Sequence, residues 1–223
     1  MERVIYTEKL SKSFPVGGAR VQVLKEISME IPKGKLTILK GRSGSGKTTL
    51  LNMLGALDEP TSGEVIFQGK KLSRLSAREK ENLRRYEFGF VFQSVALIPV
   101  MTAYENVEFA LRLGAYAGDR DRRIRECLQQ VGIGKRMHHM ANQLSGGEQQ
   151  RVAIARAMAH HPKVIFADEP TGALDTGSGF AVMQIFRELT QTGEVTIVMT
   201  THDPELMEQG DVVYEMTDGG GSP

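Results

Sequence analysis

The segment Gly41–Thr48 has the residue types and spacing of a loop that can bind phosphate. Its sequence, GRSGSGKT, fits the pattern G-x-x-x-x-G-K-[ST] and lies between an apolar run, Leu36–Leu39, and a helical run, Thr49–Leu57. Glycines let backbone N–H groups converge on phosphate oxygens, and the dipole of the following helix adds positive potential. We expect Lys47 to reach the β- and γ-phosphates of a nucleotide and Thr48 to offer its hydroxyl to Mg²⁺.

A pair of carboxylates follows a second apolar run. Val164–Ala167 is continuously apolar, as a strand buried on both faces should be, and it is followed directly by Asp168 and Glu169. Neighbouring side chains in an extended segment point in opposite directions. We therefore assign Asp168 to Mg²⁺ and Glu169 to the water molecule that attacks the phosphate.

A histidine follows a third apolar run, Val195–Thr200, in the order Thr201, His202, Asp203. A single histidine of this kind is most often structural. In an open parallel sheet, however, ligands gather beyond the carboxyl ends of the strands. Three such ends here present a phosphate loop, two carboxylates and an imidazole, so we expect His202 to contact the γ-phosphate.

The segment Gln143–Arg151, with the sequence QLSGGEQQR, contains two glycines at the start of an amphipathic run. Ser145 and Glu148 fit an S-x-x-E capping box, so the segment predicts a helix start. Each glycine inside a helix costs about 1 kcal/mol relative to alanine. We infer that Gly146 and Gly147 leave backbone N–H groups free to contact an anion, which predicts a second phosphate-binding surface.

The elements that must position these residues can be placed from the hydrophobic pattern. Short strand-like runs near the N-terminus, a helical stretch from about 102 to 143, and then alternating helices and strands predict an α/β fold with a parallel sheet. The expected early strands are Val21–Leu24, Ser28–Ile31, Leu36–Leu39 and Glu64–Phe67, and the later elements are Gln149–His161, Val164–Ala167, Gly179–Thr190 and Val195–Thr200. Asp119–Arg123 is expected to be a solvated helix start, and Cys127 a buried small hydrophobic residue.

Composition limits the class of partner and the compartment. Lys and Arg number 28 against 27 Asp and Glu, a formal net charge of +1, which argues against non-specific binding of nucleic acid. The single cysteine cannot form an intramolecular disulfide, and the N-terminus lacks the apolar core of a secretory signal. No run is long enough to span a bilayer. We therefore expect a cytoplasmic protein whose contact with a membrane is peripheral.

These motifs, taken together, resemble those of the ATP-binding cassette family over essentially the whole chain. LSGGE at 144–148 resembles the family signature, 41–48 its Walker A motif, and 164–169 its Walker B motif. His202 resembles the switch histidine, Gln93 the glutamine of the Q-loop, and Ala173–Asp175 the D-loop. The resemblance implies an ATPase with a P-loop core, an N-terminal antiparallel β subdomain and a helical insert, with ATP and Mg²⁺ bound.

The resemblance also implies domain limits and residue roles. The chain would be one nucleotide-binding domain, 1–223, with a β subdomain and the first part of the core at 1–93, a helical subdomain at 94–148 and the rest of the core at 149–223. The implied catalytic residues are Lys47, Gln93, Glu169 and His202, and the implied Mg²⁺ ligands are Thr48, Gln93 and Asp168. The implied nucleotide-binding residues are Phe14, Gly41, Arg42, Ser43, Gly44, Ser45, Gly46, Lys47, Thr48, Thr49, Ser145, Gly146, Gly147, Glu148 and Asp175. Phe14 lies where the family usually has a tyrosine that stacks on adenine.

Within the family, three segments resemble the branch of lipoprotein-release, macrolide-export and antimicrobial-peptide-resistance ATPases. They are Leu57–Glu64, Gly89–Gln93 and Glu105–Val107. The family implies a head-to-tail homodimer. The branch implies that this homodimer works at the inner face of the cell membrane with a separate permease that has a large extracytoplasmic loop. Two segments depart from the usual pattern: Val95–Pro99 replaces an Asn-Leu-Leu-Pro type segment, and Met199–His202 ends in Thr-Thr-His where Val-Thr-His is usual.

Other function classes share parts of this pattern. A signalling or cell-division module that pulls on a membrane protein without transport would have the same catalytic residues, so this alternative stays open. Cassette ATPases of DNA repair or translation usually carry a long coiled coil or a second cassette, which this sequence lacks. A P-loop GTPase is disfavoured because no N-K-x-D element occurs.

Overall fold

The computed structural model describes residues 2–217 and 220–222. The strands are β1 (Arg3–Val16), β2 (Ala19–Ile27), β3 (Glu30–Pro32), β4 (Leu36–Lys40), β5 (Ser62–Phe67), β6 (Lys70–Lys71), β7 (Phe88–Val91), β8 (Val164–Ala167), β9 (Thr196–Thr201), β10 (Val212–Thr217) and β11 (Gly220–Ser222). The α-helices are α1 (Lys47–Leu54), α2 (Ala77–Asn82), α3 (Ala103–Leu113), α4 (Arg120–Gln130), α5 (Gly146–Met158), α6 (Thr176–Gln191) and α7 (Pro204–Met207). Short 3-10 turns cover Leu72–Arg74, Gly134–Arg136 and Ala141–Gln143, and Leu83–Glu87 forms a π-helical turn.

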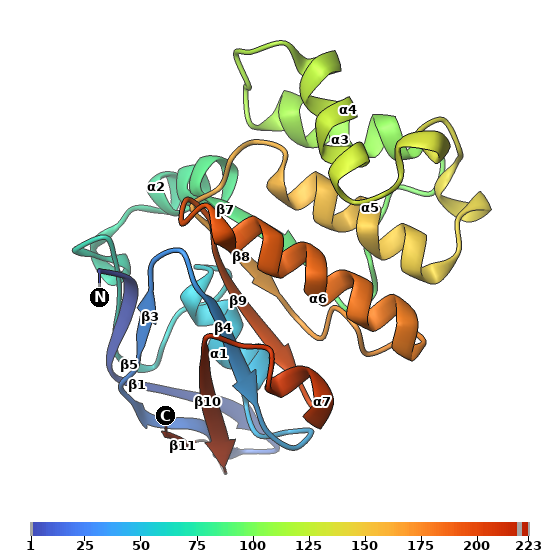
Figure 1. Ribbon diagram of the computed structural model, residues 1–223. Helices are drawn as coiled ribbons and strands as arrows, with labels where there is room; N and C mark the ends of the chain where they lie inside the picture. The colour runs from blue at the N-terminus through green and yellow to red at the C-terminus, as the bar shows by residue number, and fades with distance from the viewer. Residues whose placement is uncertain (1, 218–219, 223) are drawn as a thin grey trace.

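The central sheet has the strand order β11-β10-β4-β9-β8-β7, and its neighbouring strands from β10 to β7 are parallel. Strand β11 pairs antiparallel with β10 at the edge. Because β4, β9 and β8 are neighbours, the loops that follow their carboxyl ends meet at one edge of the sheet (Figure 1). The expected parallel α/β core is confirmed.

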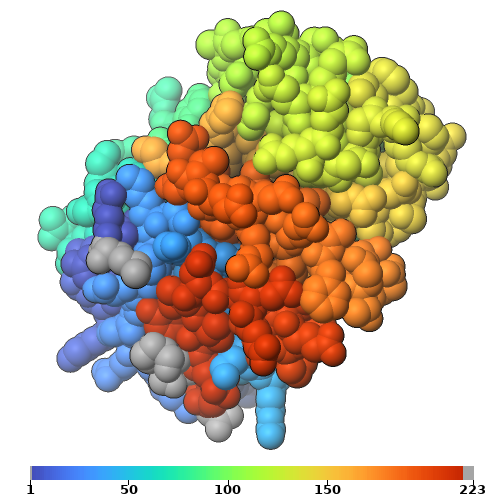
Figure 2. Space-filling model, in the orientation of Figure 1, coloured from blue at the N-terminus to red at the C-terminus, as the bar shows by residue number. Residues whose placement is uncertain are grey.

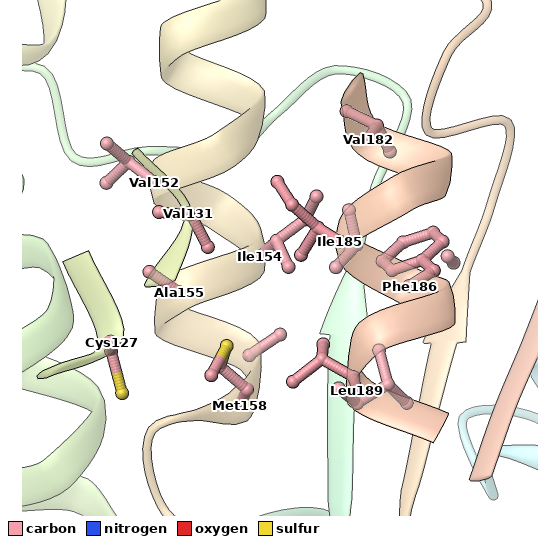
Figure 3. Close-up of a cluster of buried hydrophobic side chains, with 14 of the residues drawn as sticks. Cys127, Val131, Val152, Ile154, Ala155, Met158, Val182, Ile185, Phe186 and Leu189 are labelled. Atoms are coloured by element: carbon pink, nitrogen blue, oxygen red, sulfur yellow. The ribbon is translucent and has the colours of Figure 1, made fainter. Parts of the chain in front are cut away.

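Alternation along the central strands places side chains in two separate cores. In β4, Ile38 belongs to the core formed with α5 and α6, whereas Leu39 belongs to the core formed with α1 and the N-terminal sheet. Ile165 and Phe166 of β8 divide in the same way. This burial on both faces explains why the strands are continuously apolar. Figure 3 shows side chains of α5 and α6 facing one another in the first core.

The N-terminal sheet is antiparallel, with the order β2-β1-β5-β6 and β3 also paired to β1. It confirms the expected β subdomain. The long strand β1 was not among the expected strands. Its register shifts next to Leu10 and Glu8, and Lys9 between them has a φ of 46°. These irregularities interrupt the polar–apolar alternation by which a strand is recognised in a sequence.

The helical insert lies at one end of the molecule (Figures 1 and 2). Helices α3 and α4 bury Val107, Leu111, Ile124 and Leu128 in the core shared with α5. Cys127 is fully buried among them, as expected, and burial raises the pKa of its thiol to about 11.

The expectation that 119–123 is only a solvated helix start is wrong at its last residue. Asp119 caps α4 as expected, accepting from the Arg122 backbone N–H. Arg123, however, turns toward the C-terminal end of α5, where its guanidinium donates to the carbonyl oxygens of Ala159 and Met158, both at 2.9 Å. A cation is stabilising at this position because the last carbonyls of a helix have no partner within it.

Candidate active site

The loop between β4 and α1 has the backbone of a phosphate-binding cradle. Gly46 is the N-cap of α1 and has a left-handed conformation, with φ at 96°. A Cβ added to Gly41 would lie 2.5 Å from the carbonyl oxygen of Met216, so the loop passes too close to its neighbour for any side chain there. A Cβ on Gly44 would meet no atom within 4 Å, which leaves room above the loop. The Ser45 hydroxyl is buried and has no hydrogen-bond partner among the described residues. These features fit an anion held by the loop.

Lys47 is held inside this loop and not in solvent. Its side chain is 5% exposed, and its ammonium donates to the carbonyl oxygens of Gly41, at 2.7 Å, and Arg42, at 3.0 Å. The same ammonium lies 3.9 Å from a carboxylate oxygen of Glu169. A positive charge therefore lies between the phosphate loop and the second of the two predicted carboxylates.

The side chain of Asp168, just after β8, accepts a hydrogen bond from helix α1, which follows the phosphate loop. The Thr48 hydroxyl donates to Oδ1 of Asp168 at 3.0 Å, and the backbone N–H of Asp168 donates to the Val91 carbonyl at 2.9 Å. A hydroxyl and a carboxylate are oxygen donors of the kind that Mg²⁺ takes together with water and substrate phosphates. Among residues 2–217 and 220–222 no cluster of three or more His, Cys, Asp or Glu could hold a metal alone. The Thr48 hydroxyl and the Asp168 carboxylate fit an Mg²⁺ ion that takes further ligands from water and phosphate.

Glu169 is the residue on which the other predicted catalytic groups converge. Its Oε2 accepts a hydrogen bond from the Gln93 amide at 3.4 Å and lies 3.4 Å from Nδ1 of His202. Gln93 follows β7 and His202 follows β9, so three strand ends and the P-loop lysine meet at one carboxylate. The predicted grouping of Lys47, Gln93, Glu169 and His202 is therefore present in the structure.

The reason why the two carboxylates diverge differs from the expected one. Asp168 faces Thr48, and Glu169 faces Gln93 and His202. The expectation assumed an extended segment, but Glu169 has a φ of 43°, in the left-handed region. The chain leaves the strand at this residue, so the divergence comes from a turn of the backbone as well as from strand alternation.

A residue that the sequence patterns did not single out also contacts this pair. The Thr200 hydroxyl, on β9, donates to Oδ1 of Asp168 at 2.8 Å and accepts from the backbone N–H of Glu169 at 2.8 Å. The signal available in the sequence was the departure Met199–His202 from the usual Val-Thr-His pattern. That departure places a hydroxyl where a methyl group is usual.

The predicted signature segment forms the start of α5. Ser145 is the N-cap, its hydroxyl accepts from the backbone N–H of Glu148, and the Glu148 carboxylate accepts from the backbone N–H of Ser145 at 2.8 Å. This backbone hydrogen bond is the main reason why the pKa of Glu148 is lowered. Arg136 forms an ion pair with the same carboxylate at 3.0 Å. The carboxylate thus has a capping role in the structure.

The two glycines of this segment differ in their surroundings. A Cβ on Gly147 would lie 2.7 Å from the hydroxyl oxygen of Ser178 in α6, whereas one on Gly146 would meet only Leu174, at 3.9 Å. Packing against α6 therefore accounts for one glycine, and the interpretation that both serve an anion is incomplete. Asp175 is the N-cap of α6 and accepts from the backbone N–H of Ser178 at 3.0 Å. Within the described residues no hydrogen bond or ion pair joins the segment Ser145–Glu148 to the P-loop.

Phe14 lies on β1, opposite Val21 of β2. Its ring is half-buried, and the ammonium of Lys12 lies 4.9 Å from the ring centre. Lys12 is itself held by Asp58 at 2.8 Å. Phe14 therefore offers an aromatic surface at the edge of the β subdomain.

A groove of about 640 Å³ adjoins the segment that follows Gln93. Aromatic and aliphatic side chains from β7, the following loop and α3 line it, among them Phe90, Phe92, Ile98 and Phe109. Arg156 of α5 also lines it and donates to the carbonyl oxygens of Ala96, at 2.6 Å, and Val95, at 3.3 Å. Phe92 and Phe109 are about two-fifths exposed, so an apolar surface faces solvent beside the Q-loop segment.

Comparison with known proteins identifies the family. A model of the ABC transporter family matches residues 24–172. This chain belongs to the ABC transporter family. It is 45% identical to an uncharacterised ABC transporter ATP-binding protein of Thermotoga maritima, over 98% of this chain and 94% of that protein. It is also 48% identical to the macrolide export ATP-binding/permease protein MacB of Wolinella succinogenes, over 97% of this chain and 34% of that protein.

The solved structures agree with the fold. The ATP-binding cassette MJ0796, described as a dimer in a post-hydrolysis state with ADP and Pi bound, superposes with a TM-score of 0.90 at 39% identity, covering 98% of this chain and 97% of that one. The chain is an ABC ATPase domain, with the expected ATP-binding function. It spans about a third of the length of its MacB relatives. None of the helices in the described part of this ABC domain combines the length and hydropathy needed to cross a bilayer.

Proposed function

We propose that this ABC domain binds MgATP between two copies of itself, hydrolyses it, and thereby drives an integral membrane permease. The observation that carries the proposal is the convergence of Lys47, Gln93 and His202 on the carboxylate of Glu169 at the edge of the parallel sheet. A carboxylate in this position can orient a water molecule and take its proton, with a cation and an imidazole on either side to stabilise phosphate charge.

Residues 41–49 would hold the phosphates, with Lys47 as their cationic partner, and Phe14 would stack on the base. The ligands of Mg²⁺ would be Thr48, Asp168 and Gln93. The ion would neutralise negative charge on the phosphates. Since the Gln93 amide nitrogen is directed at Glu169, the amide oxygen is the atom that remains for a cation.

The second copy is proposed because no hydrogen bond or ion pair links the phosphate loop to the signature segment within the part of the chain that the structure describes. Ser145, Gly146, Gly147 and Glu148, with Asp175 of the D-loop, would complete the nucleotide site of the partner in a head-to-tail homodimer. The dimeric state described for MJ0796 supports this arrangement. An anion at the start of α5 would also be favoured by the helix dipole.

The membrane partner is proposed to be a permease of the large-extracytoplasmic-loop type, bound at the groove beside Ala96–Tyr104. The apolar residues that line the groove and the name of the MacB relative support a permease. The substrate class would be a lipoprotein, a peptide or an antibiotic-like molecule, exported or extracted from the membrane. The ABC domain would act at the inner face of the membrane, and no nucleic acid takes part.

The substitution Glu169→Gln tests the catalytic part of the proposal. It keeps the size of the side chain and removes the base, so ATP binding and ATP-dependent dimerisation should persist while turnover falls at least about a hundredfold, in the range lost with a general base. Glu126→Gln, on the exposed face of α4, is the control and should keep full turnover. Hydrolysis at the normal rate in Glu169→Gln would remove Glu169 from this role.

Affinity capture of membrane proteins from native membranes tests the proposed permease partner. Tagged Glu169→Gln protein with ATP should retain an integral membrane chain with a large extracytoplasmic loop, identified by mass spectrometry. The same protein carrying Phe109→Asp in the groove should bind ATP normally and lose that chain. Capture of a membrane chain without transport activity would favour a signalling or cell-division role, and recovery of nucleic acid in its place would contradict the proposal.

A further inference from the structure

Thr200 contributes a buried hydroxyl to the edge of the sheet where the candidate active site forms. It lies one residue before the end of β9, and none of its surface is exposed. The neighbouring strand β8 ends just before the two carboxylates, so Thr200 faces them across one strand pair. A buried hydroxyl that forms no hydrogen bond destabilises the fold, so the Thr200 hydroxyl is expected to have hydrogen-bond partners.

The two hydrogen bonds of this hydroxyl join it to the Asp168 carboxylate and to the backbone N–H of Glu169. Thr200 donates to Oδ1 of Asp168, and the Thr48 hydroxyl donates to the same oxygen, at 2.8 and 3.0 Å respectively. Two donors from opposite sides, one on β9 and one on α1, hold that carboxylate in one orientation. Oδ2 of Asp168 takes part in neither bond.

The second hydrogen bond concerns the backbone at Glu169. Its N–H donates to the Thr200 hydroxyl at 2.8 Å, and the residue has the left-handed φ of 43° that a non-glycine residue adopts at a cost. The hydrogen bond stabilises this turn. Since the turn directs the Glu169 side chain toward Gln93 and His202, the hydroxyl acts on both carboxylates at once.

We propose that Thr200 is a positioning residue for ATP hydrolysis, which orients the Asp168 carboxylate and stabilises the backbone turn at Glu169. The inference rests on the proposed roles of those two residues. Because the hydroxyl contacts the two carboxylate residues and not the proposed phosphate or water, it should tune the reaction without being indispensable.

The decisive variant is Thr200→Val, which keeps the shape of the side chain and removes both hydrogen bonds. We expect kcat to fall about tenfold, the fold-change that corresponds to about 1.4 kcal/mol, and KM for ATP in the presence of Mg²⁺ to rise several-fold. Thr200→Ser keeps the hydroxyl and should restore kcat to within about twofold of the original protein.

A binding measurement separates the positioning of Asp168 from turnover. With a fluorescent ATP analogue and EDTA, the original protein and Thr200→Val should bind equally. With Mg²⁺ added, the original protein should gain affinity, and Thr200→Val should gain several-fold less, because Asp168 is then less well oriented.

Thr196→Val provides the matched control. Thr196 is on the same strand, is equally buried, and accepts a hydrogen bond from the backbone N–H of Gly34, away from the site. It should lose stability to a similar degree with kcat and Mg²⁺ dependence unchanged.

Three results would overturn the inference: kcat in Thr200→Val within twofold of the original value, equal losses of kcat in both valine variants, or no rescue by serine. If Glu169→Gln is inactive while Thr200→Val behaves normally, only this inference fails. If the original protein does not hydrolyse ATP, the proposed function fails.

Discussion

Gly147 in the first turn of α5 lies so close to Ser178 in the first turn of α6 that a methyl group on the glycine would stand 2.7 Å from the serine hydroxyl oxygen and 3.0 Å from its Cβ. The proposed ATP-contacting segment is thus packed directly against the helix that Asp175 caps. A movement of the start of α5 must therefore be accommodated by α6.

Gly147→Ala should destabilise the protein. The added methyl group forces the two helices apart, and overpacking of this kind costs about 1–3 kcal/mol. Gly146→Ala places its methyl group in ordinary contact with Leu174, at 3.9 Å, and should leave the stability of the single chain unchanged or slightly higher, since alanine favours the helix. Urea unfolding checks both, and equal stability of the two variants would contradict the packing argument.

The same two variants distinguish the packing of this segment against α6 from its proposed contact with nucleotide. If the backbone N–H of Gly146 approaches the nucleotide of a partner chain, Gly146→Ala should weaken ATP-dependent dimerisation of the Glu169→Gln protein despite its normal stability. Sedimentation with and without ATP measures this. Normal dimerisation of Gly146→Ala would remove the residue from the nucleotide site.

Arg156 should hold the segment that follows Gln93. Its guanidinium bonds two carbonyls at Val95 and Ala96, whose φ values of 59° and 49° are both in the left-handed region. Arg156→Gln should lower the free energy of unfolding by about 2 kcal/mol, the scale of hydrogen bonds from a charged donor, and speed proteolysis at residues 94–98. Arg156→Lys should be intermediate. Unchanged cleavage at these residues in Arg156→Gln would show that the segment is held by other contacts.

The adjacent arginines Arg122 and Arg123 should differ sharply in their effect on stability. Arg123→Met removes two hydrogen bonds to the end of α5 and should cost about 2 kcal/mol. Arg122→Met removes an exposed ion pair with Glu126 and should cost less than about 0.5 kcal/mol. Chemical denaturation of both proteins decides the matter, and equal losses would mean that Arg123 does not cap the helix.

His160 should make the fold less stable in acid. Burial lowers the pKa of His160 below its ordinary value near 6.5, although its hydrogen bond to the Phe88 carbonyl opposes the shift. Above that value the imidazole is neutral in the folded and the unfolded chain. Below it the unfolded chain takes up a proton that the folded chain resists, so stability falls with pH. The burial of the neighbouring His161 acts in the same direction.

His160→Gln keeps an N–H donor and does not titrate. The loss of stability between pH 7.5 and 5.5, measured by urea unfolding, should therefore be smaller in this variant than in the original protein. A difference between the two proteins that does not vary with pH would exclude His160 as the cause.

The local structures that the sequence predicts correctly are those in which the residues of a motif also fix their own backbone conformation. Gly41–Thr48 must form a glycine-rich turn before a helix, and Ser145 with Glu148 closes a capping box within four residues, so both could be inferred from spacing. Strand β8 was predicted with its observed bounds because burial on both faces leaves a continuous apolar run. Strand β1 was missed because its bulges depend on its partners.

Residue types and their spacing are enough to predict the groups needed for phosphate chemistry and the strand ends that carry them. They are enough because each motif is built from neighbouring residues whose geometry is local. The contacts between residues distant in the chain are visible only in the folded protein: Thr200 with Asp168 and Glu169, Arg123 with the end of α5, Arg156 with the loop after Gln93, and Gly147 with Ser178. Such contacts depend on sheet order and helix packing, and the spacing of residues along a sequence does not give the distances between packed elements.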